Sequence, residues 1–304
     1  MDATVRKGGV SASTRAVVGR KRSARWILAE IVLPASLYVV LLAGCVPFLA
    51  PFLFMLSTSI KGRAEIFIVP IRWIPKRPMW SNYREALFGY LPFYVYMWNT
   101  IKVIAGCMVG DVLLCSLVAY GFARLRAPGR EVLFMLVLST MMLPGQVLLI
   151  PTYVLFKYMR LIGSLWSLIL PNMLAGGAFY IFLFRQFFQT IHPEMSDAAK
   201  VDGCSLLGTY WRIFIPISKP VFITVAIFSF FGQWNSFLWP LILVGGEPKN
   251  LTVALGLRRF QGAHSTEWGL QMAASVMALA PCLILFFAAQ QYFMQGVVIT
   301  GVKG

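Results

Sequence analysis

The chain has 304 residues, of which 59% are hydrophobic and 12% charged, and its mean hydropathy is +0.74. Soluble domains carry about a quarter charged residues, so this composition excludes a water-coated globule and indicates a protein covered by lipid. A formal net charge of +16 raises the possibility of a nucleic-acid partner. However, the basic residues lie between apolar segments and in an N-terminal arm, which favours loops beside anionic lipid.

The first 25 residues form a basic arm, rich in Ser, Gly and Arg, with positive charges from Arg6 to Arg25. Such a polar composition is typical of disorder. The apolar run that follows, Ile27 to Leu56, is longer than the roughly 7–15 residues of a signal-peptide core, so it predicts a retained span. We therefore expect a disordered cytoplasmic arm over residues 1–25 and one membrane domain over residues 26–304.

Six segments reach the roughly 20 apolar residues that a helix needs to cross a bilayer. They are Trp26–Leu56, Phe93–Phe122, Val132–Phe156, Leu165–Phe188, Pro220–Val244 and Leu270–Met294. Internal prolines are tolerated in such spans because neighbouring helices satisfy the freed backbone groups. Gly106-x-x-x-Gly110 in the second span predicts close approach of another helix. The fold class expected is an all-α polytopic membrane protein.

Six spans place both termini on one side of the membrane. The Lys and Arg residues of the arm, and those after the second and fourth spans, favour the cytoplasm for that side. The loop from Lys61 to Arg84 is also basic and contains Trp73 and Trp80, which indicates a segment lying on the opposite membrane surface.

The most patterned polar segment lies between the fourth and fifth spans, at about residues 189–219, and is called the 189–219 loop below. Pro193 suits the first position of a helix, where its missing N–H is not needed. Glu194 and Asp197 then favour the positive end of that helix. Ala198 and Ala199 are strong helix formers that leave a bare surface, which can enter a groove on a partner.

The rest of the loop predicts a second short helix. Asp202 and Gly203 end the first helix, with the glycine in a left-handed turn. Leu206, Leu207 and Tyr210 follow at helical spacing as a second apolar face, and Pro216 ends the segment. Such a two-part helix can bind a partner and pass its movement into the adjoining spans. The alternative is a surface helix that binds nothing.

Groups for catalysis or metal binding are not brought together by the sequence. His192 and His264 lie in different predicted loops, and neither has a second ligand at metal spacing. The sequence has no phosphate loop, and in the nearest approach to one, Gly203–Thr209, Thr209 stands where the lysine is needed. We therefore expect no enzyme, no metal and no cofactor in this chain, and any ATP on another polypeptide.

Polar residues within the spans are candidates for a solute pathway. Asp111 lies deep in the second span, where a charge costs at least about 2.5–3.5 kcal/mol, so it lines a pathway or pairs with a neighbouring helix. The fifth span carries Gln233, Trp234, Asn235 and Trp239. Polar groups beside tryptophan suit a sugar, while helix–helix hydrogen bonds and an aromatic belt are the alternative.

The string DAAKVDGCSLLGTYWRIFIPISKP, from Asp197 to Pro220, resembles the EAA loop of permease subunits in ATP-binding-cassette importers. That family pattern has an acid-Ala-Ala core, Asp-Gly and a later proline, with Asp197 here in place of the usual glutamate. Further strings resemble the carbohydrate branch, the relatives of the smaller maltose permease subunit. They are Asn99-Thr100, Ala119-Tyr120-x-Phe122-Ala123-Arg124, Trp234-Asn235-x-Phe237-x-Trp239-Pro240-Leu241 and Gln291-Tyr292-Phe293-x-x-Gly296.

The resemblance implies the type I importer permease fold with six transmembrane helices, in the plasma (inner) membrane of a prokaryote. It implies a second permease that completes the pore, two ATPase subunits that bind ATP and Mg, and an extracellular or periplasmic binding protein that delivers a sugar or oligosaccharide. The coupling residues it implies are Glu194, Asp197, Ala198, Ala199, Asp202, Gly203, Leu206 and Pro216. The pathway candidates are Asn99, Asp111, Gln233, Trp234, Asn235 and Trp239.

Three alternatives remain open at this point. The same architecture could import a glycerol phosphodiester, an amino acid or phosphate. A secondary transporter would work without an ATPase, but the scarcity of buried acids argues against ion coupling. A membrane scaffold without transport would have no use for the polar groups of the second and fifth spans.

Overall fold

The computed structural model describes residues 33–262 and 266–301, and within these ranges nearly all regular structure is helical. The pairing of extended backbone seen in the described residues is a single bridge between Gln261 and Thr266. The all-α prediction is therefore confirmed. The predicted arm, residues 1–25, and His264 lie outside the described residues.

By its internal contacts the chain divides into two units, residues 1–53 and residues 54–304. The described part of the first unit belongs to helix α2 (Leu33–Ser59), which contains Pro47 and Pro51. Its large apolar side chains, such as Leu42 and Phe48, are exposed. An apolar helix of this length with exposed side chains is typical of contact with lipid.

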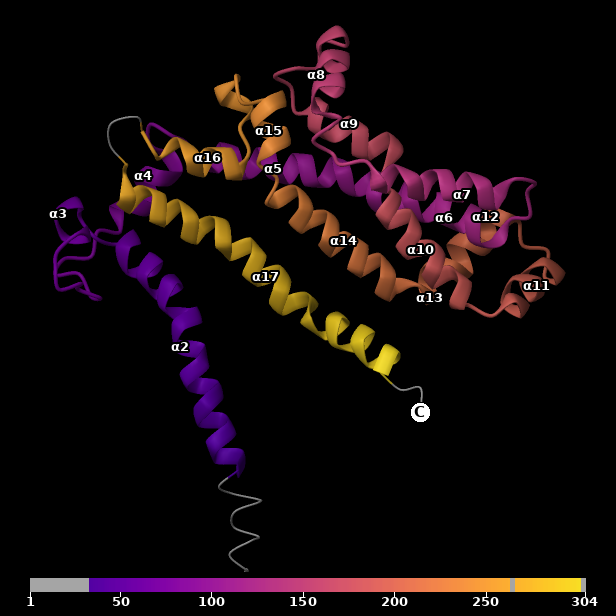
Figure 1. Ribbon diagram of the computed structural model, residues 1–304, viewed down its shortest axis with the longest axis horizontal. Coiled ribbons are helices and arrows are strands. Elements are labelled where there is room, and N and C mark those ends of the chain that lie inside the picture. The colour runs from indigo at the N-terminus through magenta and orange to yellow at the C-terminus, as the bar shows by residue number, and fades with distance from the viewer. Residues whose placement is uncertain (1–32, 263–265, 302–304) are drawn as a thin grey trace, which may run out of the picture. The chain divides into compact units, whose positions relative to one another are not determined.

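The other helices belong to the second unit. In chain order they are α3 (Arg63–Ile66), α4 (Ser81–Phe88), α5 (Phe93–Met108), the π-helix η2 (Val109–Leu114), α6 (Cys115–Arg124), α7 (Arg130–Ser139), the 3-10 helix η3 (Thr140–Met142), α8 (Leu149–Tyr158), α9 (Trp166–Ala175), α10 (Ala178–Thr190), α11 (Pro193–Val201), α12 (Leu206–Thr209), the π-helix η4 (Tyr210–Phe214), α13 (Ile215–Ile217), α14 (Lys219–Trp234), α15 (Leu238–Leu243), the 3-10 helix η5 (Pro248–Asn250), α16 (Val253–Arg259) and α17 (Trp268–Gly301) (Figure 1).

Four helical stretches of the described chain are long and apolar enough to cross a membrane. They are Ser36–Ser59, Phe93–Arg124, Trp166–Thr190 and Trp268–Gln290, and they match the first, second, fourth and sixth predicted spans. A fifth is present if Leu206–Ile217 and Lys219–Trp234, which meet at a bend of 80°, are taken as one broken span.

The third predicted span, Val132–Phe156, is not one continuous helix, so that prediction is wrong. The helical backbone ends at Met142 and resumes only at Leu149. Pro144 explains the break, because proline has no N–H to donate and disfavours helical backbone at the residue before it. Leu143 is accordingly extended, with a ψ of 119°.

The fifth predicted span, Pro220–Val244, is also divided. Helix α14 ends at Trp234, and α15 begins at Leu238 after a short turn. Pro240 cannot donate the hydrogen bond that would continue α14 through this region. The turn brings Gln233, Ser236 and Trp239 to a cavity described below.

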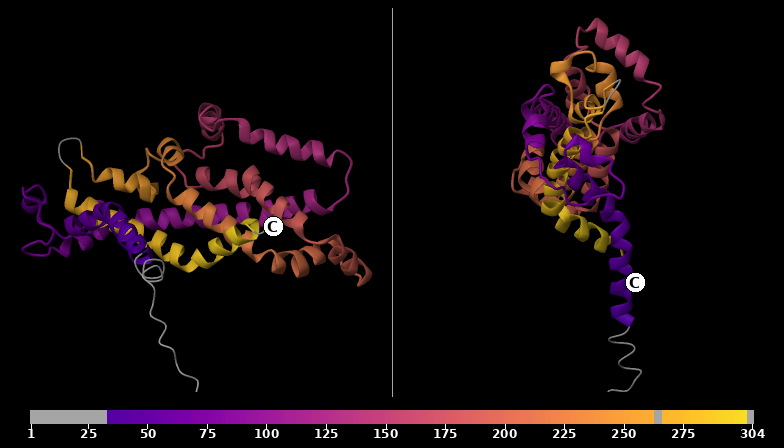
Figure 2. Two further views of the ribbon diagram at one scale, coloured as in Figure 1. Left: turned by 60° about the horizontal axis from the view of Figure 1, so that its bottom comes forward. Right: turned by 90° about the vertical axis from the view of Figure 1, so that its left-hand side faces the viewer.

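Buried apolar side chains of the second unit form two clusters. One includes Phe93, Val103 and Trp234, and joins α5, α9, α14, α16 and α17. The other includes Phe184 and Phe214, and joins α6, α10, η4 and α14. The views in Figures 1 and 2 agree in placing α10 along α6, with α11 beyond the end of this pair.

Two glycines permit the close packing of the second span against α9. A Cβ at Gly110 would lie 1.8 Å from the carbonyl oxygen of Asn172, and one at Gly106 would lie 2.5 Å from Ile169 Cγ2. Both distances are far below van der Waals contact. The close helix approach predicted from Gly106-x-x-x-Gly110 is therefore confirmed.

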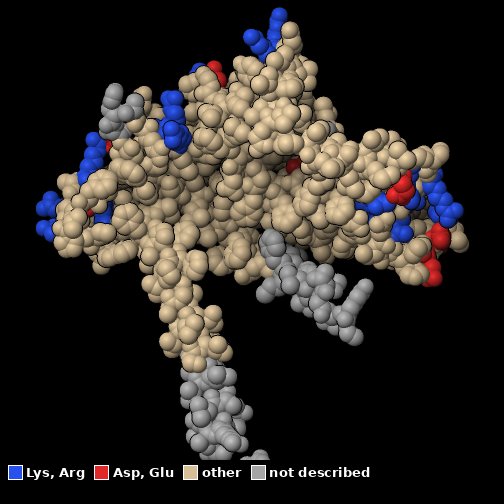
Figure 3. Space-filling model, viewed as in Figure 1, with Lys and Arg blue, Asp and Glu red and all other residues tan. Residues whose placement is uncertain are grey.

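Charged side chains gather at the left and right ends of the second unit and at the top of the view in Figure 3, and most of the surface between these groups is uncharged. The end on the right of the figure carries the 189–219 loop and the turn after α6. An apolar band between two charged zones is the arrangement expected of a protein that crosses a bilayer.

Candidate functional site

The 189–219 loop folds as predicted, as a helix, a glycine break and a second short helix. His192 is extended just before α11, and Pro193 occupies the first helical position. Gly203 adopts the left-handed conformation with a φ of 74°. The N–H of Cys204 then donates to the carbonyl oxygen of Ala199 at 2.8 Å, which satisfies the end of α11.

The second short helix begins with a side-chain cap. Ser205 Oγ accepts a hydrogen bond from the N–H of Gly208 at 3.0 Å. The chain then widens into the π-helix η4 and ends in α13, where Pro216 lies in the first turn and is exposed. The loop is thus held by local hydrogen bonds at each of its turns.

One face of the loop is exposed and carries both acids and large apolar side chains. Glu194, Ala198 and Asp202 are exposed. Asp197 is exposed too, and the Lys200 ammonium, 2.9 Å from it, lowers the pKa of its carboxyl by a hydrogen bond and by charge. The exposed apolar side chains beside these acids are those of Val201, Leu206 and Leu207. An exposed apolar patch with a polar rim is typical of an interaction surface.

The opposite face of the loop is packed against the protein. Ala199 is only 3% exposed, and Tyr210 is 1% exposed. Tyr210 therefore does not share the exposed face of Leu206 and Leu207, which corrects the prediction from helical spacing. The widened turn of η4 and the contacts of Tyr210 with α6 place its ring inside the second cluster.

Helix α6 provides the surface on which the loop rests, through polar residues four positions apart. Ser116 Oγ and the Tyr210 hydroxyl are 2.7 Å apart. The Tyr120 hydroxyl donates to the carbonyl oxygen of Leu206 at 3.2 Å. Tyr120 also packs on the ring of Phe214 in η4, with ring centroids 4.9 Å apart.

Arg124 completes this stripe at the end of α6. Its guanidinium donates to the carbonyl oxygen of Phe188 at 2.6 Å, and also to that of Ile191, just before α11. It lies 5.0 Å from the ring centroid of Phe214. Ser116, Tyr120 and Arg124 therefore join the second span to the end of α10 and to both ends of the loop.

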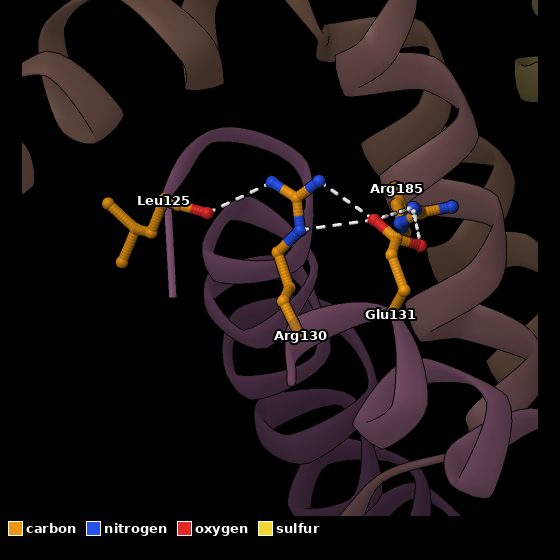
Figure 4. Close-up of polar contacts among 4 residues, drawn as sticks. All are labelled: Leu125, Arg130, Glu131 and Arg185. Carbon is orange, nitrogen blue, oxygen red and sulfur yellow. Dashed lines mark hydrogen bonds and ion pairs between the residues drawn. The ribbon is translucent and has the colours of Figure 1, made fainter. Parts of the chain in front are cut away.

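An ion cluster supports the same end of the protein, shown in Figure 4. Arg185 of α10, 8% exposed, pairs with Glu131 at 2.9 Å and lies over the ring of Phe134. Arg130 donates to Glu131 and to the carbonyl oxygen of Leu125, both as drawn in Figure 4. Arg130 first and then Arg185 lower the pKa of the Glu131 carboxyl by hydrogen bonds and charge. The cluster ties α7 to α10 and to the end of α6.

A cavity of about 470 Å³ lies among α8, α9, α14 and α15, and Val103 of α5 also lines it. Its polar side chains are those of Thr152, Ser167, Asn172, Gln233, Ser236 and Thr252. Its apolar walls include Phe156 and Trp239. No Asp, Glu, Lys, Arg or His is among the residues that line it.

Comparison with known proteins identifies the family to which the chain belongs. The model of the "Binding-protein-dependent transport system inner membrane component" family matches residues 112–299. The chain belongs to this family.

Its relatives are named as transport permeases, some of them as permeases of ATP-binding-cassette (ABC) transporters. The probable ABC transporter permease YurM of Bacillus subtilis (strain 168) is 32% identical, over 92% of this chain and 91% of that protein. The arabinooligosaccharide permease AraQ of the same organism is 30% identical, over 84% and 91%. The structure of a bacterial ABC transporter that imports the acidic polysaccharide alginate contains a chain that matches with a TM-score of 0.77 at 22% identity, over 87% of this chain and 98% of that one. The importer permease fold is thereby confirmed.

Two of the six pathway candidates of the permease line the cavity, namely Gln233 and Trp239. Trp234 and Asn235 lie between them in sequence but not in the cavity. Trp234 is buried and stacks on Phe230, while the Asn235 amide donates to the carbonyl oxygen of Phe231 at 3.0 Å.

Asn99 does not line the cavity either, and it is buried. Its amide donates to the carbonyl oxygens of Lys249 and Leu251, at 2.8 and 3.1 Å. Both donor positions of Asn99 are therefore occupied by backbone, and the residue fixes the segment before α16 to the second span.

Asp111 is fully buried and pairs with a neighbouring helix. Ser229 Oγ of α14 donates to its Oδ2 at 2.7 Å, while Oδ1 has no hydrogen-bond partner in the described residues. Of the two alternatives left open by the sequence, the structure shows the helix–helix pair. Asp111 does not line the cavity.

Sequence reasoning gave no role to several residues that the permease brings into these sites. Ser116, Tyr120 and Arg124 recur at intervals of four, and a polar stripe at the end of an apolar span is a signal that could have found them. Asn172 and Thr252 left no such signal, because they reach the cavity from elements far apart in the chain.

Proposed function

We propose that this chain is the permease subunit of an ABC importer for a sugar or oligosaccharide. It forms half of the pore together with a second permease. Two ATPase subunits, which bind ATP and Mg, drive it through the 189–219 loop, and an extracellular or periplasmic binding protein delivers the solute. The chain itself binds no cofactor. It lies in the plasma (inner) membrane with both termini in the cytoplasm.

The observation that carries the proposal is the division of the loop into two faces. The face with Asp197, Val201 and Leu206 is exposed, while the face with Ala199 and Tyr210 is buried, and the Tyr210 hydroxyl is hydrogen-bonded to Ser116 of α6. A partner that grips the exposed face therefore moves α6 as well as α10 and α14, the helices that flank the loop. ATP binding in the partner closes the ATPases, the loop follows, and the spans switch the side to which the pathway opens.

The sugar assignment is supported by AraQ, a relative named for arabinooligosaccharides. Import of another solute by the same architecture is the second candidate. The secondary transporter and the scaffold are not favoured, because neither has a use for an exposed loop in this position.

Uptake by the complete transporter tests the role of the loop. In Gly203→Ala the left-handed φ of 74° strains the new residue by about 1–2 kcal/mol, although a Cβ would meet no atom within 4 Å. Asp197→Lys removes the pair with Lys200 and reverses the charge at this position of the exposed face. We expect both variants to insert normally and to lose most of their uptake.

Gly246→Ala is the matched control, because Gly246 has open space around it and no positive φ. It should transport normally. The Val201→Cys variant should cross-link to the ATPase through its new thiol. Normal uptake in both loop variants, or labelling of the Val201→Cys thiol only from outside the cell, would refute the proposal.

A further inference from the structure

We propose that the cavity among α8, α9, α14 and α15 is a solute site that this subunit itself supplies, and that it takes one uncharged glycosyl unit. The inference rests on the proposed import function and adds two claims to it: the subunit contacts the solute directly, and the contacted unit carries no charge.

The size of the cavity is that of a ligand site. Its volume of about 470 Å³ falls within the roughly 300–1,000 Å³ usual for small-molecule pockets. The walls come from five helices, including α5 through Val103, and from Thr252, just before α16, so the site belongs to the folded membrane domain and not to one mobile loop. A space of this size holds a sugar ring and its hydroxyl groups.

Several polar groups of the cavity have unused hydrogen-bonding capacity. Thr252 is only 3% exposed, and its Oγ1 has no hydrogen-bond partner in the described residues. A buried hydroxyl without a partner is costly, and native proteins usually give it one. The amide of Gln233 and the hydroxyl of Ser236 likewise have no hydrogen bond within the described part of the chain. Solute hydroxyls would satisfy all three.

An aromatic wall stands beside these polar groups. Trp239 and Phe156 both line the cavity. The apolar face of a sugar ring packs on aromatic rings, while its hydroxyls bond to the polar side chains around them. Gln233 and Trp239 lie on opposite sides of the turn between α14 and α15, so the break in the fifth span creates the combination.

The charge of the lining selects among solutes. A carboxylate, phosphate or sulfonate in this cavity would find no cation, because no charged residue lines it. Amino acids, phosphate and glycerol phosphodiesters are disfavoured for this reason. A neutral sugar such as an arabinooligosaccharide fits, whereas a charged unit of an acidic polysaccharide does not.

The wall of the cavity is also in direct contact with the second span. Asn172 lines the cavity, and its carbonyl oxygen touches the backbone at Gly110. Ser229, which binds Asp111 of η2, lies one turn before Gln233 on α14. Movement of the second span therefore changes the shape of the site, as an alternating-access pathway requires.

The test uses the whole transporter in proteoliposomes, with its partner permease, ATPases and binding protein. The probes are radiolabelled arabinotriose and maltose as neutral solutes, with sn-glycerol 3-phosphate and an alginate trisaccharide as anionic ones. Gln233→Leu keeps the side-chain volume and removes the hydrogen bonds. Trp239→Ala removes the aromatic wall, and Trp239→Phe retains a ring. Thr224→Ala, also on α14 but outside the cavity, is the control.

We expect the wild type to take up a neutral probe. The uptake KM should rise about five- to tenfold in Gln233→Leu and in Trp239→Ala, the size of one lost hydrogen bond or ring contact in a desolvated site. Trp239→Phe, which keeps a ring, and Thr224→Ala, which loses a hydrogen bond to the carbonyl oxygen of Pro220 but no cavity contact, should stay within about twofold of the wild type. ATPase activity without solute should be unchanged in Thr224→Ala, and all four purified complexes should elute like the wild type in gel filtration, which shows that they are assembled.

The possible failures are distinct. If the wild type takes up none of the four probes, the proposed sugar import itself fails. If a neutral probe is taken up and both Gln233→Leu and Trp239→Ala keep the wild-type KM, import stands but the cavity is not a solute site. If only anionic probes are taken up, the claim of an uncharged unit is overturned.

Discussion

Replacement of Arg124 by lysine tests whether the stripe on α6 transmits the movement of the loop. The arginine holds two backbone carbonyl oxygens, those of Phe188 and Ile191, and also packs on Phe214. Lysine keeps the charge but lacks the planar guanidinium, whose Nη2 donates to both carbonyl oxygens while its face packs on a ring. The change therefore alters geometry while the net charge of the protein stays the same.

The expected loss follows from these contacts. One hydrogen bond to a charged donor contributes about 1.5–3 kcal/mol. The cation–π contact with Phe214 adds about 0.5–1 kcal/mol, of which lysine keeps a part. Arg124→Lys should thus loosen the attachment of the loop to the second span by about 2 kcal/mol, the lower end of the hydrogen-bond term plus part of the ring contact.

Uptake and ATPase activity measured on the same proteoliposomes separate coupling from folding. We expect Arg124→Lys to hydrolyse ATP at a near-normal rate while uptake per ATP falls several-fold. Arg126→Lys is the control, because Arg126 is exposed and makes no hydrogen bond within the described residues. A wild-type ratio of uptake to hydrolysis in Arg124→Lys would show that the stripe transmits nothing.

Three further predictions concern assembly and stability. Gly110→Ala should lower the free energy of unfolding of the purified complex by about 1–3 kcal/mol, because the new Cβ would overlap backbone atoms. Gly121→Ala should be neutral, because the nearest atom to its Cβ is 3.9 Å away. Equal melting curves for the two variants would contradict this prediction. Ser229→Ala should cost about 1.5–3 kcal/mol because it leaves the Asp111 carboxyl without a partner, and an unchanged melting temperature would count against that pairing. The arginines lower the pKa of Glu131 below its ordinary value of about 4.5, so the stabilisation from this cluster is full above that pH and is lost as the pH falls through the lowered pKa. Glu131→Gln should therefore melt at a lower temperature than the wild type at pH 7, and the two melting temperatures should converge in acid. A difference that stays constant with pH would exclude this role.

Features set by local sequence could be predicted without the structure. Apolar length alone located the first, second, fourth and sixth spans. Pro193 starts the first helix of the 189–219 loop, and Gly203, in the left-handed conformation, ends it. In each case the cause lies within a few residues of the effect.

Features set by contacts between distant parts of the chain could not be predicted from the sequence. Asn99 has the composition of a pathway residue, but its amide binds carbonyl oxygens about 150 positions further along the chain. Tyr210 has the spacing of an exposed face, but a widened helical turn and the stripe on α6 bury it. The third span was misjudged because hydropathy averages over Pro144 and does not register that it divides the helix.

The π-helix η2 sets the direction in which the side chains of α6, the part of the second span that follows it, point. Such a turn carries about one more residue than an ordinary α-helical turn, and one residue corresponds to a rotation of about 100°. Deleting a single residue from Val109–Leu114 would leave the span as apolar and nearly as long. It would, however, rotate Tyr120 and Arg124 by a quarter-turn or more away from their partners. The variant would insert into the membrane like the wild type, but movement of the 189–219 loop would no longer pass to the second span.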